Sequence, residues 1–140
     1  MNPVMIFLPV VVLALHTLLI LGLLGRRRVR AAKAGRIRVD YYKLYSGEPE
    51  PDDLRAVSRN VSNLLEFPVL FYIAALIVFL LQRVDTIYLV LAWAYVALRV
   101  LHSIIHVTYN KVVHRFRAFI LSFLVLVGLW VRLGFQLLTG

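Results

Sequence analysis

The sequence predicts an all-α membrane protein, a bundle of four transmembrane helices in a single domain of residues 1–140. Of the 140 residues, 61% are hydrophobic, and most of these lie in four long apolar stretches. Soluble domains are closer to half apolar, and a helix that crosses a bilayer needs about 20 apolar residues. We therefore expect helices at about residues 3–34, 54–82, 86–110 and 115–138.

The first stretch runs from Pro3 to Gly25 without a formal charge, and a block of arginines follows it. A basic block in place of small residues is unlike the cleavage site of a signal peptide, so we interpret this stretch as the first transmembrane helix. Residues 35–53 form the one long loop that we expect. Its segment 46–51 (Ser-Gly-Glu-Pro-Glu-Pro) cannot continue a helix.

The second helix is expected to start behind Asp52 and Asp53, because acidic residues favour the cap and first turn of a helix. Pro68 predicts a kink within it, since proline has no N–H to donate. The segment 83–85 predicts a tight turn into the third helix, and residues 111–117 form a short basic link to the fourth.

The net charge of +9 comes mainly from the two basic connections, residues 26–55 and 111–117. Basic loops between apolar spans stay in the cytoplasm and contact anionic lipid headgroups, which we favour over binding to nucleic acid. This predicts a multi-pass protein of a bacterial inner membrane with both termini on the non-cytoplasmic side. With no cysteine, the chain has neither disulfides nor a thiol nucleophile of its own.

Two clusters of polar residues lie inside the predicted spans, each spaced to share one face of a helix. The clusters are Arg59, Asn63 and Glu66 in the second helix and Arg99, His102 and His106 in the third. Charged groups inside a membrane are costly and are usually functional.

Residues at matching depth in the two antiparallel helices should touch. At 1.5 Å per residue, Glu66 and Arg99 lie about 15 Å above the cytoplasmic ends of their helices, so we expect a structural ion pair between them. The same reasoning places Asn63 near His102 or His106.

Cations still outnumber the single carboxylate, because Arg59, Arg99, Arg115 and two histidines surround it. Such an excess favours an anionic ligand. A polar network that only fixes helix register is one alternative, and a haem or metal bound by His102 and His106 is another. For His16, alone on an apolar helix, we expect a hydrogen-bonded packing role.

Both motifs together resemble the MAPEG family, membrane-associated proteins in eicosanoid and glutathione metabolism. The pattern Arg59-x-x-x-Asn63-x-x-Glu66 is followed by proline, and the pattern Arg99-x-x-His102-x-x-x-His106 lies on the next helix. The second pattern is most similar to the branch of microsomal prostaglandin E synthases and glutathione transferases, with His106 in place of a tyrosine. The resemblance covers nearly the whole chain.

The resemblance implies a homotrimer with a glutathione site between neighbouring protomers. It implies that Arg59, Asn63, Glu66, His102 and His106 bind glutathione. Arg115 would stabilise its thiolate as the catalytic residue, although Arg117 is also eligible and the predicted depth favours Arg115. Glutathione would be a co-substrate, and we expect no metal.

The leading functional hypothesis is a glutathione-dependent membrane enzyme that acts on lipophilic electrophiles or lipid hydroperoxides, of the transferase or peroxidase type. The alternative is a non-catalytic membrane protein that binds a lipid or a partner protein through the same bundle. A small channel or transporter subunit is a third class, which the sequence favours least because broken helices in a repeated arrangement are missing.

Overall fold

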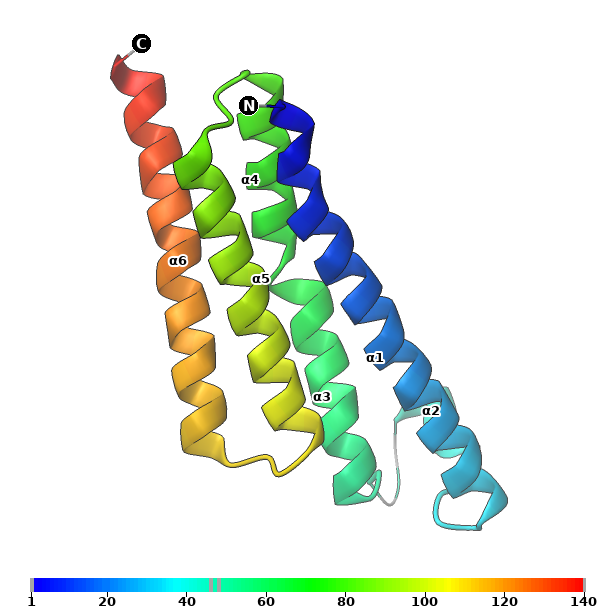
Figure 1. Cartoon of the computed structure of the whole chain (residues 1–140). Coiled ribbons are helices and arrows are strands. Elements are labelled where there is room, and N and C mark those ends of the chain that lie inside the picture. Colours follow the sequence, from blue (N-terminus) through cyan, green and yellow to red (C-terminus); the bar gives the residue numbers. More distant parts are fainter. Residues whose placement is uncertain (1, 46, 48, 140) are drawn as a thin grey trace.

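The computed structural model describes residues 2–45, 47 and 49–139, which form a bundle of long antiparallel helices (Figure 1). In chain order the elements are η1 (Pro3–Ile6), α1 (Phe7–Lys33), α2 (Tyr41–Leu44), α3 (Asp52–Glu66), α4 (Val69–Leu80), α5 (Thr86–Val107) and α6 (Val112–Thr139). Four segments are long and apolar enough to cross a membrane: Pro3–Lys33, Asp52–Leu80, Thr86–Val107 and Val112–Thr139. The predicted all-α architecture with four spans is confirmed.

The second span is broken at its middle. Helix α3 ends at Glu66, and α4 begins at Val69 in a slightly different direction (Figure 1). Pro68 causes the break, since it cannot donate to the carbonyl of Leu64 and its ring crowds that turn. The kink expected at Pro68 is therefore present.

The loop between the first and second spans contains a short helix, α2, that the sequence did not predict. Before it, Gly35 ends α1 with a φ of +67°, a backbone conformation that favours glycine. The segment 46–51 was expected to be non-helical, but Ser46 and Glu48 lie outside the described residues. Asp52 and Asp53 lie in the first turn of α3, whereas Pro51 occupies the cap position.

Helix α5 begins at Thr86, as the sequence predicted. The Asp85 side chain caps it by accepting a hydrogen bond from the backbone N–H of Tyr88 (2.9 Å). It ends at Val107 rather than near residue 110, and α6 begins at Val112 rather than near residue 115. Asn110 lies between the two helices with a φ of +47°, so the chain turns there. Helices α5 and α6 pack along each other over most of their length.

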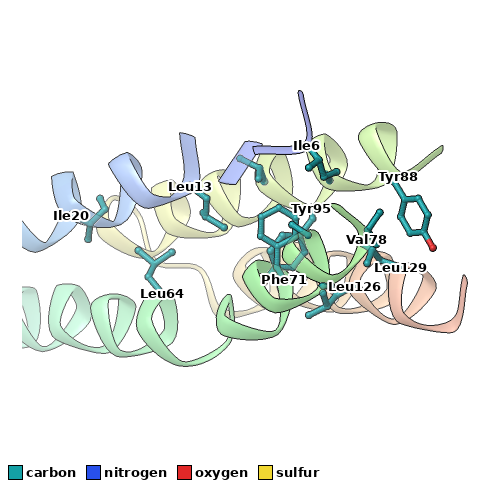
Figure 2. Close-up of a cluster of buried hydrophobic side chains, with 14 of the residues drawn as sticks. Ile6, Leu13, Ile20, Leu64, Phe71, Val78, Tyr88, Tyr95, Leu126 and Leu129 are labelled. Atoms are coloured by element: carbon teal, nitrogen blue, oxygen red, sulfur yellow. The ribbon is translucent and has the colours of Figure 1, made fainter. Parts of the chain in front are cut away.

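Large apolar side chains around α4 fill the interior near the end of the bundle that holds η1 (Figure 2). Phe71 of α4 stacks on Tyr95 of α5 with ring centroids 4.7 Å apart. Leu126 and Leu129 of α6 and Leu13 of α1 close this core (Figure 2). The other half of the bundle, around α3, holds the polar residues that form the candidate site.

Candidate ligand-binding site

Three helices bring most of the predicted site residues to one cavity of about 300 Å³. Its polar lining comes from Arg59 and Asn63 of α3, His102 and His106 of α5 and Arg115 of α6. An adjoining cavity, also of about 300 Å³, shares Arg59, His106 and Arg115 and continues toward the α5–α6 turn. Both volumes lie at the lower end of the range for small-molecule sites.

The histidines present their side chains to the cavity with different partners. The Nδ1–H of His102 donates to the backbone carbonyl of Arg115 at 3.0 Å, since a carbonyl only accepts. This bond leaves the His102 Nε2 as an acceptor. The two imidazole rings lie 5.7 Å apart. The Nδ1 of His106 is buried and has no hydrogen-bond partner among the described residues.

Arg115 is held in place by the turn that precedes α6. Its Nη1 donates to the Asn110 Oδ1 at 2.7 Å. Its backbone carbonyl, as described above, accepts from His102. Arg115 lines both cavities, whereas Arg117 is exposed and lines neither of them. Of the two arginines that the sequence left eligible, Arg115 is the one at the cavity.

The ion pair expected between Glu66 and Arg99 is not formed within the chain, so this prediction is wrong for the single chain. The Nη2 of Arg99 donates to both the backbone carbonyl (3.2 Å) and the side-chain Oδ1 of Asn63. Glu66 lies three residues further along α3, about 60° around the helix from Asn63, and is exposed. Residues of α3 and α5 do meet at the predicted depth. However, the rotation of α3 about its axis brings the Asn63 amide, and not the Glu66 carboxylate, to Arg99.

Arg99 is fully buried, with 0% exposure. Its guanidinium lies 5.6 Å from the ring centroid of Phe67 and 5.9 Å from that of Phe119. Its Nε and Nη1 atoms have no partner among the described residues. The Asn63 carbonyl that Arg99 contacts also accepts from the backbone N–H of Phe67 at 3.3 Å, directly before the break at Pro68.

The sequence analysis did not predict one buried polar contact. Asn60, fully buried, donates to the Ser103 Oγ at 2.6 Å and joins α3 to α5 one turn below Arg99. The spacing of Asn60 and Asn63 on one face of α3 was a signal that pointed to it. Phe119 was also missed. It closes one side of the cavity and lies 5.9 Å from the His102 ring.

Two further predictions concern histidines. In the part of the chain that the structure describes, no three His, Cys, Asp or Glu side chains gather closely enough to hold a metal ion. His16 is half-buried in α1, and its Nε2 has no hydrogen-bond partner there, unlike the bonded packing role that we expected.

Positive charge dominates the cavity. Arg59 and Arg115 carry it, and the carboxylate of Asp52, at the adjoining cavity, is bonded to Arg55 at 2.6 Å. Guanidinium groups bind carboxylates and phosphates through paired hydrogen bonds, so the arrangement suits an anionic ligand with several acceptor groups.

The family of the protein follows from comparison with known families. The model of the MAPEG family matches residues 6–135, nearly the full length of the chain. The chain belongs to the MAPEG family. No curated protein and no solved structure matches it. The protein is therefore a multi-pass membrane protein of a family connected with glutathione and eicosanoid metabolism. Its cavity lies within the matched residues and is lined by members of both polar motifs, Arg59 and Asn63 from one and His102 and His106 from the other.

Proposed function

We propose that this MAPEG protein is a glutathione-dependent membrane enzyme of the transferase or peroxidase type. The observation that carries the proposal is the position of Arg115. Its guanidinium is fixed by Asn110 at the cavity that Arg59, Asn63, His102 and His106 also line. A cation held at an anion-binding cavity suits the thiolate of a bound cysteine-containing ligand.

The chain supplies complementary partners for the polar groups of glutathione. Arg59 and the two histidines face the cavity, where they would bind the carboxylates of the tripeptide. The side chain of Asn63 is oriented by Arg99, which uses the Asn63 Oδ1 as its acceptor and leaves the Asn63 amide N–H groups for a ligand. Glu66 would contribute a further polar group to the bound tripeptide.

The chemistry needs no nucleophile from the protein. Arg115 lowers the pKa of the bound thiol by stabilising its anion, and the proton leaves to water. In a transfer reaction the thiolate forms a carbon–sulfur bond, and the leaving group departs with its electron pair. In a peroxidase reaction two glutathione molecules are oxidised to the disulfide, while a lipid hydroperoxide is reduced to the alcohol and water.

The lipophilic substrate would enter from the bilayer. Val112, Phe116 and Phe119 line the cavity beside the polar residues, and the first two are mostly exposed. This apolar wall also supports the second candidate function, a non-catalytic protein that binds a lipid or a partner through the same bundle.

A homotrimer completes the proposal. Glu66 is exposed on the surface of the second span, at a depth where a carboxylate facing lipid is costly. A neighbouring protomer at this face would cover it and close the glutathione site. By the distribution of basic residues, we infer that the cavity opens to the cytoplasm of a bacterial cell and that both termini lie on the opposite side.

Two measurements on the detergent-purified protein separate the candidates. Calorimetric titration should detect glutathione binding, and incubation with glutathione and a chloronitrobenzene should release chloride and form the conjugate. With a lipid hydroperoxide, the same sample should form glutathione disulfide. Binding without either product would support the non-catalytic candidate, and no binding of glutathione would exclude the enzyme.

A further inference from the structure

The end of α1 that carries the arginines extends beyond the hydrocarbon part of a bilayer. The uncharged part of this helix, residues 7–25, is about 28 Å long, which matches a hydrocarbon core of about 30 Å. When residues 7–25 span the hydrocarbon core, the remaining two turns, residues 26–33, extend among the lipid headgroups, and Arg27 and Arg30 reach the level of the lipid phosphates.

The loop that follows α1 is fastened to the bundle by one buried carboxylate. Glu50 is 5% exposed and accepts hydrogen bonds from the Arg28 Nε (2.9 Å), the Tyr42 hydroxyl (3.1 Å) and the Ser58 hydroxyl (2.7 Å). The Arg28 guanidinium also lies 4.8 Å from the centre of the Tyr42 ring. Burial and the bond to Glu50 raise the pKa of Tyr42, so its hydroxyl stays protonated and donates. These contacts fix the position of α2 beside α1 and α3.

In this fixed position, the loop exposes apolar side chains. Val39 is 70% exposed, Leu44 82% and Tyr45 64%. Arg38 and Lys43 lie among them. Exposed apolar residues interspersed with cations are typical of segments that rest in a membrane interface, where the apolar groups enter the acyl boundary.

A pocket of about 280 Å³ lies between the end of α1 and the start of α3. Its lining consists of Arg27, Arg30, Ala31, Ala34, Arg36 and Asp53. Asp53 neutralises Arg36 through two hydrogen bonds of 2.7 and 3.3 Å, which also hold that guanidinium still. Arg27 and Arg30 have no ion-pair partner among the described residues, and the two alanines leave room above them.

We propose that this pocket binds the phosphate headgroup of an anionic phospholipid from the adjacent leaflet, with the loop lying on the membrane surface beside it. The two uncompensated arginines bind the phosphate, and the exposed apolar residues of the loop contact the acyl chains of neighbouring lipids. The site is separate from the cavity around Arg115, because the two cavities share no lining residue.

Native mass spectrometry of the detergent-purified protein tests the proposal with phosphatidylglycerol and phosphatidylcholine as probes. The unmodified protein should retain phosphatidylglycerol in preference to phosphatidylcholine. The double variant R27Q/R30Q should bind phosphatidylglycerol at least about tenfold more weakly, since it removes both guanidinium partners of the lipid phosphate. The matched control K111Q/R117Q removes two cations from the other connection at the same end of the bundle, and it should keep the preference.

The variant Ala34→Trp gives a second, charge-conserving test, because an indole placed on this exposed residue fills the pocket. It should lose the preference while it elutes as the unmodified protein does in size-exclusion chromatography. Equal loss in both double variants, or retention in Ala34→Trp, would overturn the proposal in favour of non-specific charge attraction. Thermal stabilisation by inorganic phosphate without any lipid preference would also overturn it, by assigning the pocket to a soluble anion.

Discussion

Arg99 determines how the polar residues at the centre of this protein are arranged. Its fully buried guanidinium has one neutral partner, Asn63, and lies beside two aromatic rings, Phe67 and Phe119, that contact each other. A buried charge is tolerated only with good hydrogen bonds, so Asn63 has two tasks. It stabilises Arg99, and it presents its remaining amide groups to the cavity. The identity of residue 63 therefore links the stability of the bundle to the shape of the site.

Replacing Asn63 with alanine removes the side-chain acceptor of Arg99. We expect the free energy of unfolding to fall by about 1.5–3 kcal/mol, the contribution of a hydrogen bond to a charged group. Thermal melting in detergent measures the change. Ser62→Ala, at an exposed neighbouring position on α3, is the control and should melt as the unmodified protein does. Equal melting of the two variants would mean that Arg99 has another partner.

Asn110 is expected to act as a positioning residue for Arg115. Asn110→Gly deletes the acceptor of the guanidinium but tolerates the φ of +47°, so the turn itself should persist. We expect glutathione to bind about tenfold more weakly to this variant, with an unchanged melting temperature. Titration calorimetry provides the measurement, and Lys111→Ala is the control. Unchanged affinity would show that Arg115 holds its position without Asn110.

At the scale of elements, the contacts of Glu50 fasten the loop between α1 and α3. Glu50→Ala removes three hydrogen bonds and leaves Arg28 without its carboxylate. We predict faster amide hydrogen exchange across residues 36–45, measured by mass spectrometry. Asp52→Ala provides the control, because Asp52 is exposed and its ion pair is with Arg55 of the same helix rather than with the loop. Unchanged exchange in Glu50→Ala would mean that the loop is held by other contacts.

The elements also show which features could be predicted from sequence. Apolar stretches of sufficient length predicted the four spans, and Pro68 predicted the break between α3 and α4. Helix α2 was missed, because four residues carry no helical periodicity. The α5–α6 turn was expected in the correct region, but the end of α5 and the start of α6 each lie three residues before the predicted positions. No clear signal in the sequence indicated that Asn110 adopts a left-handed backbone conformation.

Depth and periodicity predicted which polar residues of α3 and α5 share a cavity, including Asn63 with His102 and His106. They failed for Glu66 and Arg99, because depth alone does not give the rotation of a helix about its axis. A difference of about 60° between Asn63 and Glu66 decided which side chain Arg99 contacts. The bond between Asn60 and Ser103 was missed because the sequence interpretation followed charged residues, and neither of these side chains carries a charge.

At the scale of the whole molecule, the exposed carboxylate of Glu66 bears on assembly. If a neighbouring protomer covers this face, native mass spectrometry should find a trimer. Glu66→Ala should then shift the population toward monomer at the same protein and detergent concentrations, because it removes a partner from the interface. Ser62→Ala controls for the loss of polarity on the same helix. A monomer in the unmodified protein would contradict the proposed assembly.

The central claim is that Arg115 stabilises the thiolate of glutathione in the cavity between α3, α5 and α6. Ultraviolet difference spectroscopy tests it most directly, because a bound thiolate absorbs where the thiol does not. We expect a thiolate band when glutathione is added to the purified protein, its loss in Arg115→Ala, and its retention in Arg117→Ala. Glutathione binding without a thiolate band, or a band that persists in Arg115→Ala, would contradict it.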